Sequence, residues 1–251
     1  MRIILLAFSL LFSISRASSA PQELSGSQII EKMSEVINPA QVKALMKQII
    51  ITTSGKERTF VYESFSKNRG EKNLIRYISP RRVKGQAFLM LNYSDDIWSY
   101  FPRTERVRKL ASHAKRQKIM GSDFTYEDMG SGEAFKKYYN SLRLEDKSLK
   151  GVDCYIIQLT PREGEDISYS KIVAWIRKTD FFPLRIDYYE EDKLLKKLIL
   201  SDIDIIEGVP TARSMTMYNV QDNTKTIMEV VEVSYNVELP DEMFTERGLK
   251  R

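Results

Sequence analysis

Short segments rich in Ile, Val, Phe and Tyr recur along the 251-residue chain, separated by compact turns of Gly, Asn, Asp and Ser. Such short connections make consecutive strands antiparallel neighbours, which predicts a meander. The first group of expected strands spans residues 47–53, 58–67, 73–79, 86–93, 97–101 and 107–110. The second group spans residues 152–160, 171–177, 184–189, 194–206, 212–220 and 226–237.

One amphipathic helix is expected ahead of the strands. Ser25 and Gln28 form a capping-box pair at its start, and Asn38-Pro39 ends it. Its apolar stripe consists of Ile29, Ile30, Met33, Val36 and Ile37. A second short helical turn is weakly indicated at residues 41–46. The sheet is the only partner that can bury this stripe.

About a dozen strands with so few helices predict a mainly β (α+β) fold in one domain, residues 21–251. We expect a strongly curved antiparallel sheet that forms an incomplete β-barrel, with the helix and a lid segment over its concave face. Ala87–Leu91 is apolar at every position, which predicts burial on both faces. In the last strand, Ile227 and Val231 are expected on one face, with Thr226 on the other.

The first twenty residues are typical of a signal peptide. Arg2 precedes an apolar stretch at residues 3–14, which is short for a membrane span, and small residues follow. Cleavage is expected after Ala17 or Ser19. We therefore expect a soluble periplasmic protein, exported across the inner membrane.

Composition excludes several kinds of site. A single Cys cannot form an intramolecular disulfide or a Cys-built metal site, and a single His excludes most zinc sites. His113 lies in a basic loop, Cys154 lies within an apolar strand, and the acidic run Glu190–Asp192 falls in an expected hairpin turn. We expect a protein that is not an enzyme, with no cofactor and no metal. Export makes nucleic acid an unsuitable partner.

The stretch between the two strand groups interrupts the meander. Ser122 or Asp123 can cap a short helical turn there, and Phe124 and Met129 can fold over the sheet as a lid. The expected lid motif comprises Gly121, Ser122, Asp123, Phe124, Tyr126, Glu127 and Asp128. Its three carboxylates leave a divalent-cation loop as an alternative, although their spacing matches no EF-hand pattern.

A series of short motifs then occurs in a fixed order along the chain. These are YISP at Tyr77–Pro80, KGQAFL at Lys84–Leu89, WSYFP at Trp98–Pro102, RVRKL at Arg106–Leu110 and GSDFTYED at Gly121–Asp128. Their order resembles the LolA-like family of outer-membrane lipoprotein-sorting proteins over nearly the whole mature chain. The resemblance implies an open β-barrel, plugged by helices, that encloses a hydrophobic cavity for acyl chains.

An acyl-chain cavity needs an apolar lining that adapts to irregular chains, which suits Met and aromatic side chains. The candidates for the lining are Phe88, Met90, Trp98, Tyr100, Met120 and Phe124, although ordinary core is an alternative role for each. We expect a monomeric carrier or binding protein that sorts lipids or lipoprotein acyl chains toward the outer membrane. The alternative is an accessory protein that docks on an inner-membrane lipid or RND-type transporter without cargo; a lipid hydrolase is a weaker third hypothesis.

Basic residues are concentrated ahead of the lid motif. Arg103, Arg106 and Arg108 are candidates for docking on lipid headgroups, on a membrane transporter or on an outer-membrane acceptor. If Val107 faces inward, alternation along a strand turns Arg106 and Arg108 outward. The alternative is that these arginines pair with Asp123, Glu127 or Asp128 and hold the lid. We expect docking for Arg106 and the structural role for Arg108.

Overall fold

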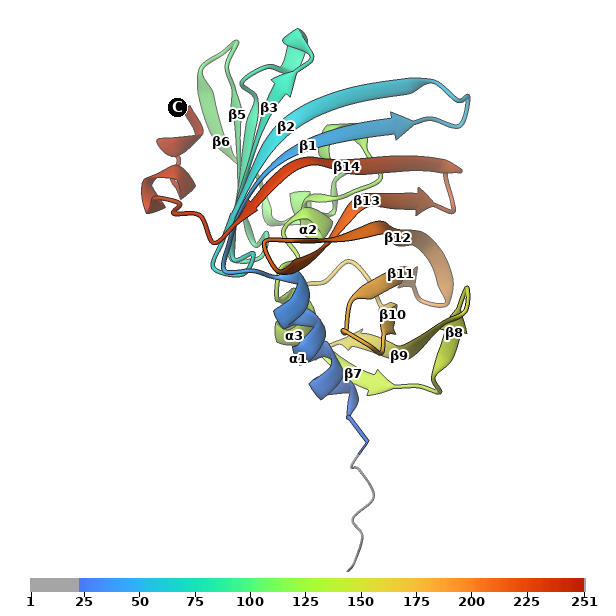
Figure 1. Ribbon diagram of the computed structural model, residues 1–251. Coiled ribbons are helices and arrows are strands. Elements are labelled where there is room, and N and C mark those ends of the chain that lie inside the picture. Colours follow the sequence, from blue (N-terminus) through green and yellow to red (C-terminus); the bar gives the residue numbers. More distant parts are fainter. Residues whose placement is uncertain (1–22, 251) are drawn as a thin grey trace, which may run out of the picture.

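Fourteen antiparallel strands form one sheet that makes up most of the computed structural model, which describes residues 23–250 (Figure 1). The strands are β1 (Gln41–Ile51), β2 (Glu57–Lys67), β3 (Lys72–Ser79), β4 (Ala87–Leu91), β5 (Asp96–Phe101), β6 (Arg106–Lys109), β7 (Tyr139–Arg143), β8 (Lys147–Leu149), β9 (Val152–Pro161), β10 (Lys171–Arg177), β11 (Pro183–Glu190), β12 (Lys193–Ile206), β13 (Val209–Asn219) and β14 (Thr224–Tyr235). The α-helices are α1 (Gly26–Ile37), α2 (Tyr126–Met129) and α3 (Ala134–Tyr138). Short 3₁₀ helices occur at Arg81–Val83, Ser112–Arg116, Ile119–Gly121, Asp241–Phe244 and Gly248–Lys250.

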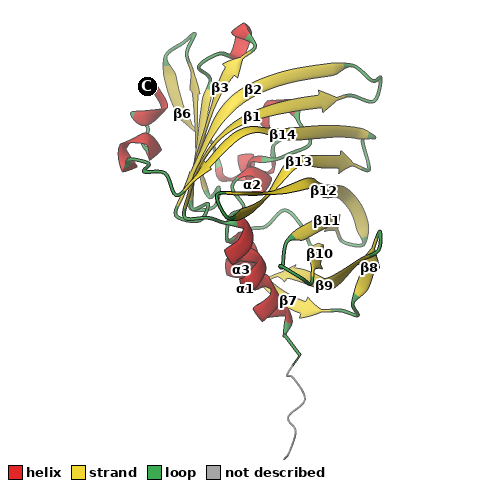
Figure 2. Ribbon diagram, in the orientation of Figure 1, coloured by secondary structure: helices red, strands yellow, loops and turns green. Residues whose placement is uncertain are grey.

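The first and last strands meet in the middle of the sheet. The strand order is β6-β5-β4-β3-β2-β1-β14-β13-β12-β11-β10-β9-β7, and β8 pairs only with β9. Two meanders therefore spread in opposite directions from the β1–β14 pair, and within the described chain their outer strands β6 and β7 remain unpaired edges. The sheet curves strongly without closing (Figure 2). The predicted open, mainly β barrel is confirmed.

Residues 110–138, here called the crossing segment, join one edge of the sheet to the other. The segment leaves β6 at one edge and enters β7 at the opposite edge, and it carries α2 and α3. Because its ends lie at opposite edges, it has to cross one face of the sheet, and its apolar residues belong to the concave-side core. Figure 1 shows it inside the curve, so the lid motif lies over the concave face as expected.

The N-terminal helix begins and ends as its sequence predicts. The Ser25 hydroxyl and the Gln28 side chain form the capping box, and Asn38 follows the last helical residue. Ile29, Ile30 and Met33 are buried, with α1 packed against β7, β9, β13 and α3. The predicted helical turn at residues 41–46 is wrong, because that segment is the start of β1 and alternates in burial as a strand does.

A large apolar core, here called the concave-side cluster, fills the space between the sheet, α1 and the crossing segment. From the sheet it takes Ala44, Met46, Ile50, Phe60, Tyr62, Ile75, Tyr77, Phe88, Met90, Ile97, Ile157, Leu159, Ile172, Ala174, Ile176, Ile186, Tyr188, Met217 and Met228, among others. From the crossing segment it takes Ile119, Phe124, Tyr126, Ala134 and Tyr138. The lid is therefore part of the core.

A smaller apolar cluster lies on the convex face, where the C-terminal residues fold back over β3, β4 and β5. It contains Phe65, Leu74, Ala87, Leu89, Leu239, Phe244 and Leu249, with Trp98, Tyr100 and Val107 packed against it. This second cluster explains why β4 is apolar on both faces, which confirms that prediction.

Two of the predicted cavity-lining residues, Trp98 and Tyr100, lie on the convex side, so their assignment to the concave lining is wrong. On β5, Ile97 and Ser99 point inward and are buried, and alternation sends Trp98 and Tyr100 outward. The indole Nε1 of Trp98 donates a hydrogen bond of 3.0 Å to Glu246 Oε1, in the C-terminal segment.

The inward face of β14 also differs from the prediction. Thr226 and Met228 are buried, whereas Val231 is exposed. The pairing of β1 with β14 shifts between Leu45 and Met46, so strict alternation fails along this strand. Strands β7 and β8, which follow the crossing segment, were not predicted from the sequence.

The signal-peptide prediction concerns residues 1–20, which lie outside the described residues. Within residues 23–250, no helix combines the length and the apolarity needed to cross a bilayer. Helix α1, for example, has 12 residues, whereas a spanning helix needs about 20.

Candidate functional site

Four of the predicted lining residues lie on the concave side of the sheet. Phe88, Met90 and Phe124 are buried in the concave-side cluster, and Met120 packs against it. The Phe88 ring meets the ring of Tyr126 edge-on, with 5.4 Å between centroids. These side chains bring the sheet and the lid motif into direct apolar contact, and their part in ligand binding remains a prediction.

The lid motif has its own local structure. Met120 and Gly121 both have positive φ, and they turn the chain where the lid motif begins. Thr125 caps α2: its backbone N–H donates to Asp128 Oδ2 at 2.7 Å, and the Asp128 N–H donates to Thr125 Oγ1 at 3.1 Å. The expected helical turn is present, but Thr125 caps it, not Ser122 or Asp123.

Asp123 fastens the lid motif to the centre of the sheet. Its carboxylate accepts hydrogen bonds from the hydroxyls of Thr224 (2.5 Å) and Thr226 (2.8 Å) on β14, and its own N–H donates to Thr226 Oγ1 at 2.9 Å. Because Asp123 and Thr226 are both buried, breaking these bonds without replacing them leaves polar groups unsatisfied, which costs about 1–3 kcal/mol for each group.

A second anchor joins the lid motif to β12. Asp128 and Lys196 form an ion pair of 2.9 Å, with side chains only 2% and 8% exposed. Tyr169 completes a triangle, since its hydroxyl donates to Asp128 Oδ1 at 2.6 Å and lies 2.8 Å from Lys196 Nζ. Burial and the neighbouring Asp128 carboxylate raise the pKa of Tyr169 well above its ordinary value, so the phenol keeps its proton.

Glu127, the third acid of the lid motif, binds the loop ahead of β10. Its carboxylate accepts hydrogen bonds from the backbone N–H and the hydroxyl of Ser168. Burial raises the pKa of Glu127, and the hydrogen bonds from Ser168 oppose this shift only in part. The charged form is therefore less favourable in the folded protein than in water.

The lid motif also contacts the first meander, at the β4–β5 turn. The Ser94 hydroxyl, which is buried, donates to the backbone carbonyl of Tyr126 at 2.8 Å. Gly130 passes so close that a Cβ added there would stand 1.8 Å from Ser94 Oγ. Arg58 on β2, which donates to the Gly121 carbonyl at 3.1 Å, belongs to the same meander. With the anchors at Asp123 and Asp128, these contacts tie the lid to both halves of the sheet.

The enclosed space beside the lid is small. A pocket between α2, α3 and the second meander is lined by Tyr93, Phe135, Tyr139, Ile172 and Tyr188, among others, and has a volume of about 30 Å³. That is room for about two water molecules, whereas pockets for small molecules measure about 300–1,000 Å³. With the lid seated, this pocket is too small for an acyl chain.

Gln48, on β1, is the polar exception in the concave-side core. Its side chain is fully buried, and neither amide atom has a hydrogen-bond partner within the described structure. Its cross-strand neighbours are Phe60 and Met228. An unpartnered buried amide is unfavourable for folding by about 1–3 kcal/mol.

The three arginines lie elsewhere than predicted. Val107 packs into the convex-side cluster, so alternation turns Arg106 and Arg108 toward the concave side; the opposite orientation was expected. In the described structure Arg103, Arg106 and Arg108 form no ion pair, whereas the acids of the lid motif bind other residues. The prediction that Arg108 holds the lid is therefore wrong.

The remaining candidates form no catalytic arrangement. His113 is exposed on a 3₁₀ helix, and Cys154 is buried on β9, where burial raises the pKa of its thiol. Across residues 23–250, no group of three or more His, Cys, Asp or Glu side chains is placed to hold a metal ion. The lid acids form no cation loop.

Sequence reasoning missed Lys196, Tyr169 and Thr226, which bind the lid motif, and it also missed the buried Gln48. Lys196 had a usable signal, because it interrupts the apolar pattern of a long strand. Thr226 had none, since a Thr in a strand suits either face of a sheet. These residues lie far along the chain from the lid motif. Thr226, for example, follows Asp123 by 103 residues.

Comparison with known proteins gives the following matches. A family model with the description "Uncharacterized protein" matches residues 69–251. Among curated proteins, none matches the sequence. A solved domain from Vibrio parahaemolyticus, described as an outer membrane lipoprotein-sorting protein, is 27% identical, with a TM-score of 0.82 over 90% of this chain and 98% of its own.

Two further solved structures share the fold. A DUF1329 family protein from Desulfovibrio piger is 29% identical, with a TM-score of 0.81 over 89% of this chain and 97% of its own. A LolA superfamily protein from Nitrosomonas europaea is 20% identical, with a TM-score of 0.75 over 89% of this chain and 98% of its own. The last similarity concerns the fold alone.

The first prediction concerns the buried ion pair of the lid. Lys196→Met leaves the Asp128 carboxylate buried without its counter-charge, so we expect the free energy of unfolding to fall by about 3–5 kcal/mol. Adding Asp128→Asn should recover part of that loss, because the unpaired charge is then gone. Urea denaturation of the two single variants and the double variant measures the coupling. A loss below about 1 kcal/mol in Lys196→Met would contradict a buried pair.

The second prediction concerns the pH dependence of Glu127. A carboxyl whose pKa is raised by folding contributes stability below that pKa and loses the contribution as the pH rises through it. Glu127→Gln should therefore unfold at a higher temperature than the wild type at about pH 8, and the difference should shrink toward about pH 4. Melting curves across this range test it, with the exposed Glu145→Gln as control. If the variant's unfolding temperature exceeds that of the wild type equally at both pH values, burial of the Glu127 charge is not the cause of the increase.

Proposed function

The chain belongs to the LolA-like family of outer-membrane lipoprotein-sorting proteins, and from that premise we propose that it is a non-enzymatic lipid carrier. Its ligands are lipids or lipoprotein acyl chains, which bind between the concave face of the sheet and the lid motif. The observation that carries the proposal is a largely apolar inner face whose cover is fastened by a few polar anchors.

Phe88, Met90, Met120 and Phe124 are the proposed lining of the binding space. Phe88 and Met90 belong to β4, whereas Met120 and Phe124 belong to the crossing segment. Displacing the segment from the sheet separates these two pairs and opens a continuous apolar surface between them. A flexible acyl chain can fill that surface, because Met and aromatic side chains adapt to its shape.

The apolar contributions of lid and ligand are comparable. Burying an acyl chain gains about 0.8 kcal/mol per methylene, so ten methylenes give about 8 kcal/mol. Ile119, Phe124 and Tyr126 lose their burial when the lid lifts, at about 1.5–3 kcal/mol each. A chain thus replaces the apolar contacts of the lid at little net change in free energy, which suits a carrier that has to release its ligand.

Gln48 supplies the polar contact within this space. Its amide has no partner while the lid is seated, and a lipid ester or amide carbonyl can accept a hydrogen bond from its NH₂ group. A ligand that satisfies this amide removes the cost of burying it unpaired. This contact would favour acylated lipids over plain hydrocarbons.

We place this activity in the periplasm, after removal of the predicted signal peptide. The protein would act as a monomer, receiving lipid from a transporter of the inner membrane and delivering it toward an acceptor at the outer membrane. Peripheral contact with each membrane follows from such a route.

The alternative is an accessory protein that docks on an inner-membrane transporter and carries no cargo. The small enclosed volume beside the lid favours it. Native mass spectrometry of protein purified from its own periplasm, with lipid extraction, separates the two functions. Bound lipid in stoichiometric amount supports the carrier, and a lipid-free protein in complex with a transporter supports the accessory role.

The third prediction tests whether the lid has to move. The Cβ positions of Ser94 and Gly130 lie 3.0 Å apart, slightly below the 3.5–4.5 Å of a disulfide, so Ser94→Cys with Gly130→Cys in a Cys154→Ala background can form a bond after a small shift. We expect the oxidised protein to lose binding of a fluorescent fatty acid and the reduced protein to regain it. The reduced form is the matched control, since its sequence is identical. Equal binding in both states would refute a moving lid.

The fourth prediction concerns Gln48. Gln48→Leu removes the unpartnered amide, so we expect the free energy of unfolding to rise by about 1 kcal/mol or more. Affinity for a fluorescent acyl ester should fall in the same variant, because the hydrogen bond to the ester is lost. Met46→Leu, on the same face of β1, is the control for a change of shape alone. If stability increases and affinity does not change, Gln48 does not contact the ligand.

A further inference from the structure

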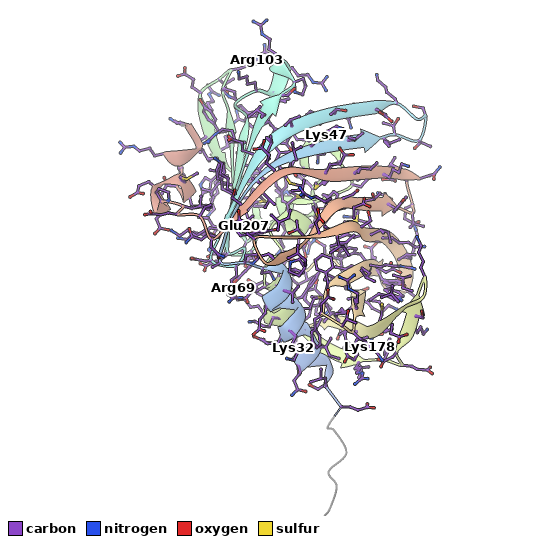
Figure 3. The ribbon with its side chains drawn as sticks, viewed as in Figure 1. Lys32, Lys47, Arg69, Arg103, Lys178 and Glu207 are labelled. Carbon is purple, nitrogen blue, oxygen red and sulfur yellow. The ribbon has the colours of Figure 1, made fainter. Side chains whose placement is uncertain are left out.

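A second, open groove lies at one end of the sheet, away from α1. It is formed by the loop between β3 and β4 and by the hairpin between β5 and β6, and Figure 3 shows Arg103 at the tip of that hairpin. The groove encloses about 910 Å³ and is lined by Arg81, Arg82, Val83, Lys84, Gln86, Phe101, Pro102, Arg103, Thr104 and Arg108. Its lining thus contains five cations and no acid.

None of these five cations has an acidic partner within residues 23–250. The ion pairs of the described chain involve other basic residues, such as Lys67, Lys72 and Lys109. A concave site with one sign of charge concentrates its electrostatic field and attracts counter-ions. Arginine is moreover suited to phosphate, because its planar guanidinium donates two parallel hydrogen bonds.

Backbone hydrogen bonds brace the loop that forms one wall of the groove, and this loop lies close to the hairpin that forms the other. Gly85 has a φ of +82°, and a Cβ at this position would lie 3.4 Å from Pro102 Cγ, so the loop and the hairpin touch here. The Gly85 N–H donates to the Tyr77 carbonyl at 2.8 Å, and the Gln86 N–H donates to the Val83 carbonyl at 2.9 Å. The cations therefore project from a formed loop.

The groove continues directly from the concave-side cluster. The Arg82 guanidinium lies 5.7 Å from the centroid of the Phe60 ring, which belongs to that cluster, and Val83 packs against the same cluster. Arg108 is paired with Ser99 and faces inward with it. Two residues along a strand span about 7 Å, so Gln86 in the groove stands about 7 Å beyond Phe88 on the same face of the sheet.

We infer that this groove binds the phosphate headgroup of the carried lipid, whose acyl chains lie along Phe88 and Met90. The inference rests on the proposed function and names its ligand class: phosphate-bearing, anionic lipids. The groove is concave and takes one headgroup between its two walls, whereas a flat membrane surface would meet only its rims. Phe101, 39% exposed at the groove, provides apolar contact for the glycerol and the first methylenes.

The test compares two soluble lipids with the same chains, dihexanoyl phosphatidylglycerol and dihexanoylglycerol. The groove variant carries Arg81→Gln, Arg82→Gln and Arg108→Gln. The control variant carries Lys56→Gln, Lys150→Gln and Lys193→Gln, which remove the same charge from exposed positions elsewhere. We expect the groove variant to bind the phosphatidylglycerol at least about tenfold more weakly than the wild type and the dihexanoylglycerol with unchanged affinity. The control variant should match the wild type for both.

Each other outcome identifies a different error. Equal loss in the groove and control variants, or no loss in either, would overturn the headgroup site and leave the carrier function intact. If neither lipid binds the wild type, the carrier function fails and the headgroup site with it. If inorganic phosphate binds as tightly as the phosphatidylglycerol, the groove is a site for free phosphate. If the groove variant keeps the soluble lipid but no longer sediments with phosphatidylglycerol vesicles, the groove docks on membranes.

Discussion

The open sheet and the single segment that joins its two edges form the constraint on which the rest of the structure depends. The two meanders end at β6 and β7 on opposite edges, and residues 110–138 have to cross between them. The apolar inner face is unfavourable in water by about 25 cal/mol per Å². The connection is therefore also the cover of the sheet.

Polar anchors decide where this cover sits. Asp123 and Asp128 belong to the lid motif, and their partners Thr226 and Lys196 belong to the sheet. Apolar packing is non-directional, so an acyl chain can replace it, but a buried carboxylate needs particular donors at particular distances. Such anchors define one position for the lid on the sheet. The unpartnered amide of Gln48 shows where the apolar interior leaves a polar group without such a bond.

The groove and the concave face together have the chemistry of an amphiphile site. Apolar side chains of β4 lead without interruption into a pocket of arginines, and Arg82 over Phe60 marks the transition. Beside β4, the inward position changes from the apolar Phe88 to the polar Gln86, which lines the groove. A lipid could thus be recognised at both ends by one continuous surface.

The sequence by itself determined the helix, most of the strands, the open barrel and the two-sided burial of β4, because these follow from local periodicity, capping and turn residues. Periodicity also tells which residues share a face, as Trp98 and Tyr100 do, but not which face becomes the inside. In the structure the C-terminal residues cover the face that carries Trp98 and Tyr100, and the crossing segment covers the other. The partners of Asp123 and Asp128, 103 and 68 positions away along the chain, were likewise decided only by the tertiary structure, because contacts between distant segments leave no local pattern.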